Sequence, residues 1–292
     1  MRPRDFAGLI LLGALWGGSF SFIRVAVPAL GPFVLVELRV GIAAAALFLC
    51  ALAVGRVPKI LSRWRSFLVL GFLNVAVPFC LISAAEIHLT ASLAAILNST
   101  TVMFAALVAA VWLGDALTPR KVTGIILGIL GVTVLVGWDP IPLSGVVLLS
   151  VAAMLIASLS YALGATYAKW SFSGLAPLGM AVGQLAAAAA LLLPFSAVTV
   201  PARVPSLTVT LCVLALALLS TAVAYLIYFR LIENVGPTST VTVTLLVPVF
   251  GLLFGVLFLD EPFGPETLAG LGIILSSVVL ITGISFGKPE GA

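Results

Sequence analysis

The chain carries the stretch WLGDALTPRKVTGIILGILGVTVLVG at residues 112–137 and a second version of it, FLDEPFGPETLAGLGIILSSVVLITG, at residues 258–283. The two align without a gap at a shift of 146 positions, which places Asp115 on Glu261. Each contains the end of an apolar helix, an acidic residue, a turn with proline, and a second apolar helix with glycines. Self-similarity at a fixed spacing is the signature of a repeated structural unit.

The similarity extends beyond this stretch. A shift of 145 or 146 positions aligns further residues of the two halves: Trp16 with Tyr161, Arg39 with Gln184, Phe79 with Tyr225, and Phe104 with Phe250. We therefore predict that one unit of about 140 residues is used twice, as residues 1–140 and 141–292.

The composition predicts an integral membrane protein. Of the 292 residues, 62% are apolar and only 8% are charged. Soluble domains carry roughly 25% charged residues, so this chain has too little charge to solvate a surface in water. The net charge of +4 does not indicate a nucleic-acid partner, because the basic residues lie in short connections between apolar segments. The expected partner is the lipid bilayer.

The apolar segments predict an all-α fold. A membrane-spanning helix needs about 20 mostly apolar residues. Ten such segments follow one another with short connections, at 6–27, 33–54, 66–86, 91–113, 120–137, 143–168, 176–197, 207–230, 238–259 and 265–286. We expect ten transmembrane helices, five in each repeat.

The basic residues predict the orientation. With the N-terminus inside, the inner segments hold Arg2, Arg4, Arg56, Lys59, Arg63, Arg65, Arg120, Lys121, Lys169, Arg230 and Lys288, and the outer ends hold only Arg24 and Arg203. Lys and Arg are enriched in cytoplasmic loops, so both termini should be cytoplasmic. Five helices is an odd number, so the second repeat must enter the membrane inverted. Inverted repeats support two similar states, one open to each side, which favours a transporter.

Several segments resemble the EamA-type exporters of the drug/metabolite transporter superfamily. LLGALWGGSFSFIRVAV is similar to their first helix, ELRVGIAAAALF to their second, TASLAAILNSTTVMFAALVAAVWLGD to their fourth and LLVPVFGLLFGVLFLDE to their ninth. The resemblance covers nearly the whole chain. It implies export of small metabolites, often amino acids, across the plasma (inner) membrane without ATP, and the aromatic amino acid exporters are the nearest subgroup. The chain departs from the family at Val102, where a proline is usual, and at Asp115, where a glutamate is usual.

Two apolar helices each carry a mildly polar face. In the fourth helix Asn98 and Thr101 lie at helical spacing, and Thr244 lies on the equivalent face of the ninth. Such faces suit a cavity that hydrogen-bonds a substrate. Small and hydroxylated residues are also used where membrane helices pack, so both interpretations stay open for the threonines, while Asn98 is costly to expose to lipid.

Aromatic residues supply a second set of candidates. Trp16, Tyr161 and Tyr225 lie deep in their predicted helices, where a ring can stack on a substrate. Thr221 and Tyr228 share a face with Tyr225, but Tyr228 is nearer the helix end, where tyrosine usually belongs to the interfacial belt.

Prolines mark two candidate hinges. Pro78 and Pro248 each free a backbone carbonyl within an apolar helix. Asn74 lies one turn before Pro78, so its side chain could either line the pathway or satisfy the freed backbone.

The few ionisable residues have open roles. Glu37 and Arg39 lie near the outer end of the second helix, and His88, the single histidine, lies at the outer mouth. Ionisable residues within a span are functional candidates, but Glu37 and His88 fit a wet rim, and Arg39 has either a structural or a functional role. For Asp115 and Glu261 we favour a cap or turn contact.

The sequence therefore predicts a secondary transporter and not an enzyme. The P-loop, H-E-x-x-H and G-x-S-x-G motifs are absent, and one histidine cannot build a metal cluster, so no cofactor or metal is expected. The three cysteines lie in apolar runs, and we expect a monomer. Because the deep candidates are uncharged, the expected cargo is a neutral or zwitterionic small molecule, foremost apolar and aromatic amino acids, moved downhill by alternating access. The alternatives are a proton-antiporting exporter of other metabolites or drugs, a channel, and a lipid scramblase.

Overall fold

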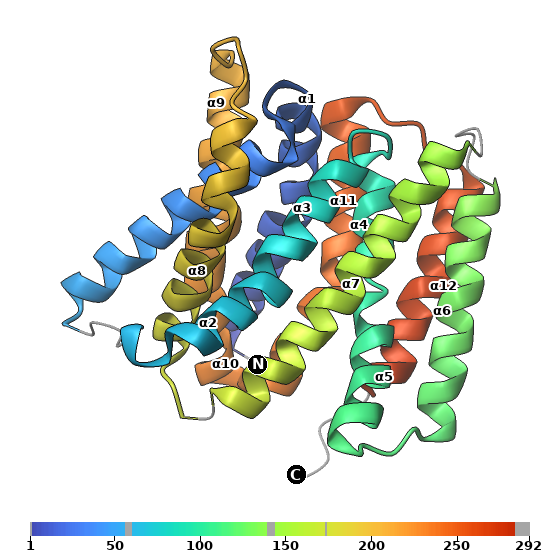
Figure 1. Cartoon of the computed structure of the whole chain (residues 1–292). Coiled ribbons are helices and arrows are strands. Elements are labelled where there is room, and N and C mark those ends of the chain that lie inside the picture. The colour runs from blue at the N-terminus through green and yellow to red at the C-terminus, as the bar shows by residue number, and fades with distance from the viewer. Residues whose placement is uncertain (1, 56–59, 139–143, 173, 284–292) are drawn as a thin grey trace.

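The structure is a computed structural model that describes residues 2–55, 60–138, 144–172 and 174–283. Every element in these ranges is helical, and the helices run side by side as one bundle (Figure 1). The elements of the first half are α1 (Pro3–Ala53), η1 (Leu61–Arg63), α2 (Trp64–Gly71), η2 (Phe72–Ala76), α3 (Val77–Ala85), α4 (Ala91–Asn98), α5 (Thr101–Leu113) and α6 (Pro119–Trp138). Those of the second half are α7 (Gly145–Ser171), α8 (Pro177–Val198), α9 (Leu207–Leu214), η3 (Ala215–Val223), α10 (Ala224–Thr240), α11 (Val243–Leu259) and α12 (Pro265–Thr282).

The first two predicted helices form the two arms of α1. This element has 51 residues and is divided at Gly31, whose φ of 70° and ψ of 164° are not helical. A positive φ is open to glycine at little steric cost. In Figure 1 the two blue arms meet at the top and diverge downwards. We call this end of the bundle, which also carries the α3–α4 connection, the far end; the start of α1 and the end of α12 lie towards the opposite, near end.

Within the described ranges, seven helices are long and apolar enough to cross a membrane, and Val243–Leu259 is a shorter apolar helix. The chain is therefore an all-helical protein of the multi-pass membrane class. The divided helix α1 is one of the seven, so the count of ten spans stays a prediction. Large apolar side chains project outwards from the bundle, among them Val111 (89% exposed) and Leu149 (72%), which suits lipid and not water as the surrounding solvent.

Two predicted spans are interrupted, and the one at 238–259 is broken between α10 and α11. The span at 91–113 is broken between α4 and α5 by a turn at Ser99 and Thr100. The hydroxyl of Thr100 donates to the carbonyl of Leu97 at 2.7 Å, a local bond that competes with the helix ladder and bends it. The helix is therefore interrupted here although Val102 replaces the expected proline.

Corresponding positions of the two halves have the same local geometry. Gly114 and Asp260, which are 146 positions apart, both end their helices in the left-handed conformation. The next residue closes an equivalent turn in each half, through Asp115 N–H to Ala109 O and Glu261 N–H to Gly255 O, both at 3.2 Å. The π-helical segments η2 and η3 also lie at equivalent places in the third and eighth predicted spans.

Candidate functional site

A buried arginine joins the second arm of α1 to η3. Arg39 is 6% exposed, and its Nε donates to the hydroxyl of Thr221 at 3.0 Å. The Thr221 hydroxyl donates in turn to the carbonyl of Leu216, five residues earlier in the wide turn of η3. The guanidinium group lies over the ring of Phe79, 3.9 Å from its centroid. At 1.5 Å per residue, Arg39 lies about 12 Å from the break at Gly31, well inside the bundle.

The equivalent contact of the other half joins α8 to η2. Gln184 is 4% exposed and accepts a 2.8 Å hydrogen bond from the side-chain amide of Asn74. Its own amide donates to the hydroxyl of Tyr225 at 3.2 Å. Gln184 is the repeat equivalent of Arg39, and Tyr225 is that of Phe79. Each half therefore sends one polar side chain to the π-helical segment of the other half, and this side chain also contacts an aromatic ring of its own half.

We call Arg39, Asn74, Gln184, Thr221 and Tyr225 the central polar cluster. It includes two of the predicted site residues, Asn74 and Tyr225. Sequence analysis left Arg39 open and gave Gln184 no role. The signal that could have found both was already present, since the repeat alignment pairs Arg39 with Gln184 and Phe79 with Tyr225.

The structure around Pro78 shows whether the Asn74 side chain satisfies the backbone carbonyl that this proline frees. Pro78 is buried directly after η2, and the carbonyl of Leu73, five residues earlier, accepts a 2.6 Å hydrogen bond from the hydroxyl of Ser160. The backbone there is thus satisfied by α7, and the Asn74 side chain is left to bond Gln184. Pro248 is likewise buried within α11. The equivalent segment η3 precedes Ala224, so the π-helical turn forms without a proline in one half. The hinge role of both prolines stays a prediction.

Aromatic rings connect Trp16 to the central polar cluster. Trp16 lies 5.5 Å from Tyr228 between ring centroids, Tyr228 lies 5.8 Å from Phe229, and Phe229 stacks on Tyr225 at 5.7 Å. Tyr161 approaches Phe79 edge-on at 6.3 Å. The three predicted aromatic residues thus lie around one centre. The ring of Tyr228 links Trp16 to the others, and its place in an interfacial belt stays a prediction.

Within the described part of the chain, the remaining predicted residues form no hydrogen bond with the central polar cluster. The hydroxyls of Thr101 and Thr244 bond the backbone of their own helices, at Asn98 O (2.7 Å) and Val241 O (2.8 Å). The side-chain oxygen of Asn98 is buried without a partner among the described residues. A buried amide oxygen without a partner is costly, so Asn98 stays a candidate to meet a ligand.

Arg39 changes the expected electrostatics of the site. The deep candidates predicted from the sequence are all uncharged, whereas the structure puts a guanidinium beside Thr221, Tyr161 and Tyr225. Its Nη1 and Nη2 have no acceptor among the residues that the structure describes. A guanidinium has five N–H donors and binds planar carboxylates through two of them, so these free donors suit an anionic group.

A carboxylate joins the two halves at the far end. Glu261 is 8% exposed and accepts hydrogen bonds from the backbone N–H of Ala91 (2.6 Å), the backbone N–H of Ser92 (2.9 Å) and the Ser92 hydroxyl (2.5 Å). We call these three bonds the far-end contact. The carboxylate sits at the N-terminus of α4, where the helix dipole favours negative charge. The expected cap contact of Glu261 is therefore confirmed.

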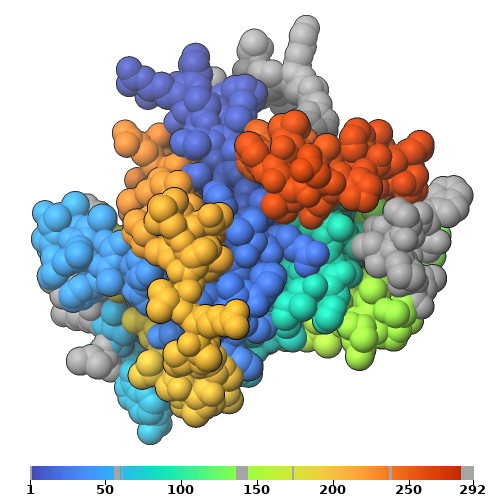
Figure 2. Space-filling model, turned by 90° about the horizontal axis from the view of Figure 1, so that it is seen from above, coloured from blue at the N-terminus to red at the C-terminus, as the bar shows by residue number. Residues whose placement is uncertain are grey.

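Gly255 makes the far-end contact sterically feasible. A Cβ at this position would lie 2.3 Å from both the Glu261 carboxylate and the Ser92 hydroxyl. Figure 2, which looks onto the far end, shows the red-orange segment near residue 260 beside the teal α3–α4 region and the blue α1. The near-end equivalents differ: Ala109 replaces Gly255, and Asp115 is exposed.

A second carboxylate is buried beside the far-end contact. Glu86, the residue that follows α3, is 0% exposed, and neither carboxylate oxygen has a partner among the described residues. Its backbone carbonyl and that of Ile87 accept hydrogen bonds from Arg24 Nη1. Sequence analysis overlooked Glu86 because it ends an apolar run, where an acidic residue is usually solvated. His88, two residues later, is exposed as expected, and Glu37 is half-buried.

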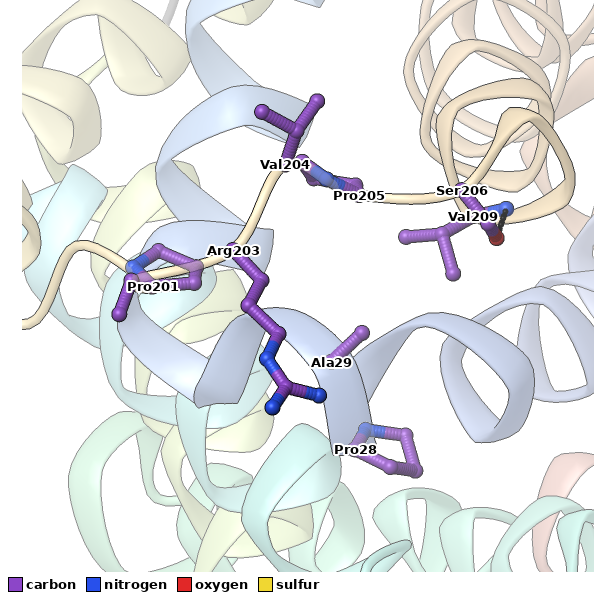
Figure 3. Close-up of a pocket in the computed structure, with 9 residues that line it drawn as sticks. Pro28, Ala29, Pro201, Arg203, Val204, Pro205, Ser206 and Val209 are labelled. Carbon is purple, nitrogen blue, oxygen red and sulfur yellow. Dashed lines mark hydrogen bonds between the residues drawn. The ribbon is translucent and has the colours of Figure 1, made fainter.

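A pocket of about 510 Å³ lies at the far end between α1 and the connection that precedes α9 (Figure 3). Its lining includes Pro28, Ala29 and Arg203, and none of the predicted site residues contributes to it. Over the described ranges, no group of three His, Cys, Asp or Glu side chains is placed to hold a metal ion.

Known proteins define the class of this molecule. A 26% identical relative, an "uncharacterized transporter" of Archaeoglobus fulgidus, aligns over 94% of this chain and 96% of its own length. A "probable amino-acid metabolite efflux pump" of Escherichia coli is 29% identical over 97% of this chain and 94% of its own. A crystal structure with 19% identity has the same fold, with a TM-score of 0.70 over 96% of both chains.

Fold and relatives together place the molecule among membrane transporters of small molecules. The model of the EamA-like transporter family matches residues 6–137 and 148–283, so the chain belongs to that family. The resemblance found in the sequence is thus confirmed at the level of the family.

Proposed function

We propose that the chain is a secondary transporter that exports neutral or zwitterionic metabolites, foremost apolar and aromatic amino acids, by alternating access. The observation that carries the proposal is the central polar cluster, in which the two halves exchange equivalent contacts around a ring of aromatic side chains. The guanidinium of Arg39 would bind the carboxylate of the cargo, and Trp16, Tyr161 and Tyr225 would pack against its apolar part. The Escherichia coli relative named as an amino-acid efflux pump supports this class of cargo.

The proposed architecture is ten spans in two inverted repeats, residues 1–140 and 141–292. The break at Gly31 and a second at Gly236, whose φ is 80°, divide α1 and α10 into shorter segments, which supports ten spans. With both termini cytoplasmic, the far end faces the outside of the inner membrane. The far-end contact is then closed, while the exposed Asp115 leaves its near-end equivalent unmade. This state would admit cargo from the cytoplasm.

A C-terminal reporter tests the proposed topology. If both termini are cytoplasmic, alkaline phosphatase fused after Ala292 should be inactive and a fluorescent protein at the same place should be bright. A further pair of fusions after Arg203 should give the opposite pattern. Active phosphatase after both Ala292 and Arg203 would contradict the predicted spans between them, and the inverted-repeat architecture would have to be abandoned.

Replacing Trp16 with alanine should lower the flux of phenylalanine in proteoliposomes. A pair between the indole ring and the ring of the cargo would add about 1 kcal/mol beyond burial, so its removal is equivalent to roughly a fivefold loss of affinity. The same experiment with Asn98→Ala tests its unpartnered oxygen. The matched control is Trp112→Ala, because Trp112 is 46% exposed at the end of α5 and should transport normally. Normal transport by both site variants, or a wild-type preference for glutamate or lysine, would contradict the proposed site.

A further inference from the structure

The surroundings of the Glu86 side chain disfavour an ionised carboxylate. It is fully buried, and both oxygens lack a hydrogen-bond partner among the described residues. Transferring an isolated carboxylate into such a place costs so much free energy that the group takes up a proton instead. Glu261, by contrast, accepts three hydrogen bonds from Ala91 and Ser92.

The charged groups that act on Glu86 come from two neighbouring elements. α1 contributes Arg24 and Arg39, and the segment after α11 contributes Glu261. α4 has no ionisable residue, and the only charged residue of α7, Lys169, lies at the opposite end of that helix. Burial raises the pKa of Glu86 well above its ordinary value, the charge of Glu261 raises it further, and the two arginines lower it. The net direction is upwards, because burial is the largest cause.

We propose that Glu86 is a proton-binding site at the outer closure of this transporter, occupied when the far end is closed and emptied to the outside when it opens. The proposal rests on the alternate opening described under the proposed function. Opening would hydrate the carboxyl group, which then ionises and releases one proton to the external water. Closing reverses the step. The site exchanges protons with one side only, so it sets the balance between closed and open states and drives no net proton transport.

The sign of the pH dependence follows from this linkage. Between the low pKa of the open state and the raised pKa of the closed state, closing takes up one proton. Each unit of external pH then changes the ratio of closed to open molecules by about tenfold, with low pH favouring the closed state. Internal pH should have no effect while the far end is closed.

The experiment measures the opening of the far end without any cargo. The three native cysteines are replaced by alanine, and Ser83→Cys introduces a thiol of nearly the same size in α3, at a position that is 1% exposed. Sealed vesicles receive a membrane-impermeant maleimide outside, at several external pH values. Because thiol reactivity also depends on pH, each rate is divided by that of Ile87→Cys, whose parent side chain is 40% exposed in the same connection.

We expect the normalised labelling rate to rise steeply with external pH and to ignore internal pH. Adding Glu86→Gln, which imitates the protonated acid, should leave the rate low at every pH. The matched control is Glu37→Gln, since Glu37 also has a buried oxygen without a partner. This control should behave like the parent.

Three results would overturn the proposal. They are a labelling rate in the parent that is independent of external pH, a pH dependence that survives in Glu86→Gln, and a pH dependence that disappears in Glu37→Gln instead. The first needs no substitution of Glu86, so the proposal can fail even if that variant does not fold. If the expected labelling pattern appears but no amino acid is transported, the proton site stands and only the proposed cargo falls.

Discussion

Replacing Arg39 with glutamine is expected to weaken phenylalanine binding by roughly tenfold to hundredfold while the protein remains folded. A hydrogen bond to a charged group contributes about 1.5–3 kcal/mol net, and Arg39 offers two free terminal nitrogens. Glutamine is what the other half carries at the equivalent Gln184, so the size and polarity of the site are preserved. Among the described residues no carboxylate bonds Arg39, whose side-chain partner is the Thr221 hydroxyl, so the substitution breaks no ion pair there.

The Arg39 prediction is measured by equilibrium binding of radiolabelled phenylalanine to purified protein. Phenylalaninamide, which lacks the carboxylate, should displace labelled phenylalanine only weakly from the wild type. Its own affinity should be the same for the wild type and for Arg39→Gln. Arg39→Lys keeps the charge without the planar fork and should fall between the two. Arg203→Gln, an exposed arginine at the far end, is the matched control. Unchanged phenylalanine affinity in Arg39→Gln would show that Arg39 only joins α1 to η3.

Replacing Glu261 with alanine is expected to open the far end. The substitution removes the acceptor for the N–H groups of Ala91 and Ser92 and for the Ser92 hydroxyl, all in a buried place. Each buried donor left unsatisfied costs about 1–3 kcal/mol, so the closed state should lose roughly 3 kcal/mol or more, which is at least a hundredfold in the closed-to-open ratio.

Labelling of Ser83→Cys from the outside measures this effect. In the Glu261→Ala background the rate should rise at least tenfold, allowing for the ceiling set by the fully open state. Asp115→Ala alters the equivalent acid at the near end, which is exposed and should leave the labelling unchanged. Equal rates in the two variants would mean that the far-end contact is a helix cap with no part in opening.

The regular helices could be predicted from the sequence, because the length of each apolar segment and the glycine and proline residues near its ends determine where the helix begins and ends. The predicted spans agree with α2–α3, α6, α7 and α8 to within a few residues. The π-helical segments could not be predicted, since no residue pattern sets them apart from ordinary helix. They form where the other half supplies a partner, as Ser160 does for Leu73.

The aromatic candidates were predictable because few large rings lie deep in the chain. Arg39 and Gln184 illustrate what the sequence leaves open, since their roles depend on which side chains of the other half they meet. Glu86 was overlooked for the same reason. Its position suggests a solvated helix end, and only the packing of α1, α4 and the segment after α11 around it creates its burial.

Glu261 makes the far-end contact, whereas its equivalent Asp115 is exposed. This difference has a consequence for the affinity of the carrier for cargo on the two sides of the membrane. A duplicated carrier with identical ends would rest equally in both orientations and show the same half-saturation constant on either side. If the far end faces outwards as proposed, only that end is closed by a contact of this kind, and most molecules would rest with the site facing the cytoplasm. The apparent affinity for external cargo is then reduced by the small fraction that faces outwards. Gradients still set the direction of net flow, but a carrier biased in this way fills readily from the cell and is poorly inhibited by what it has already released.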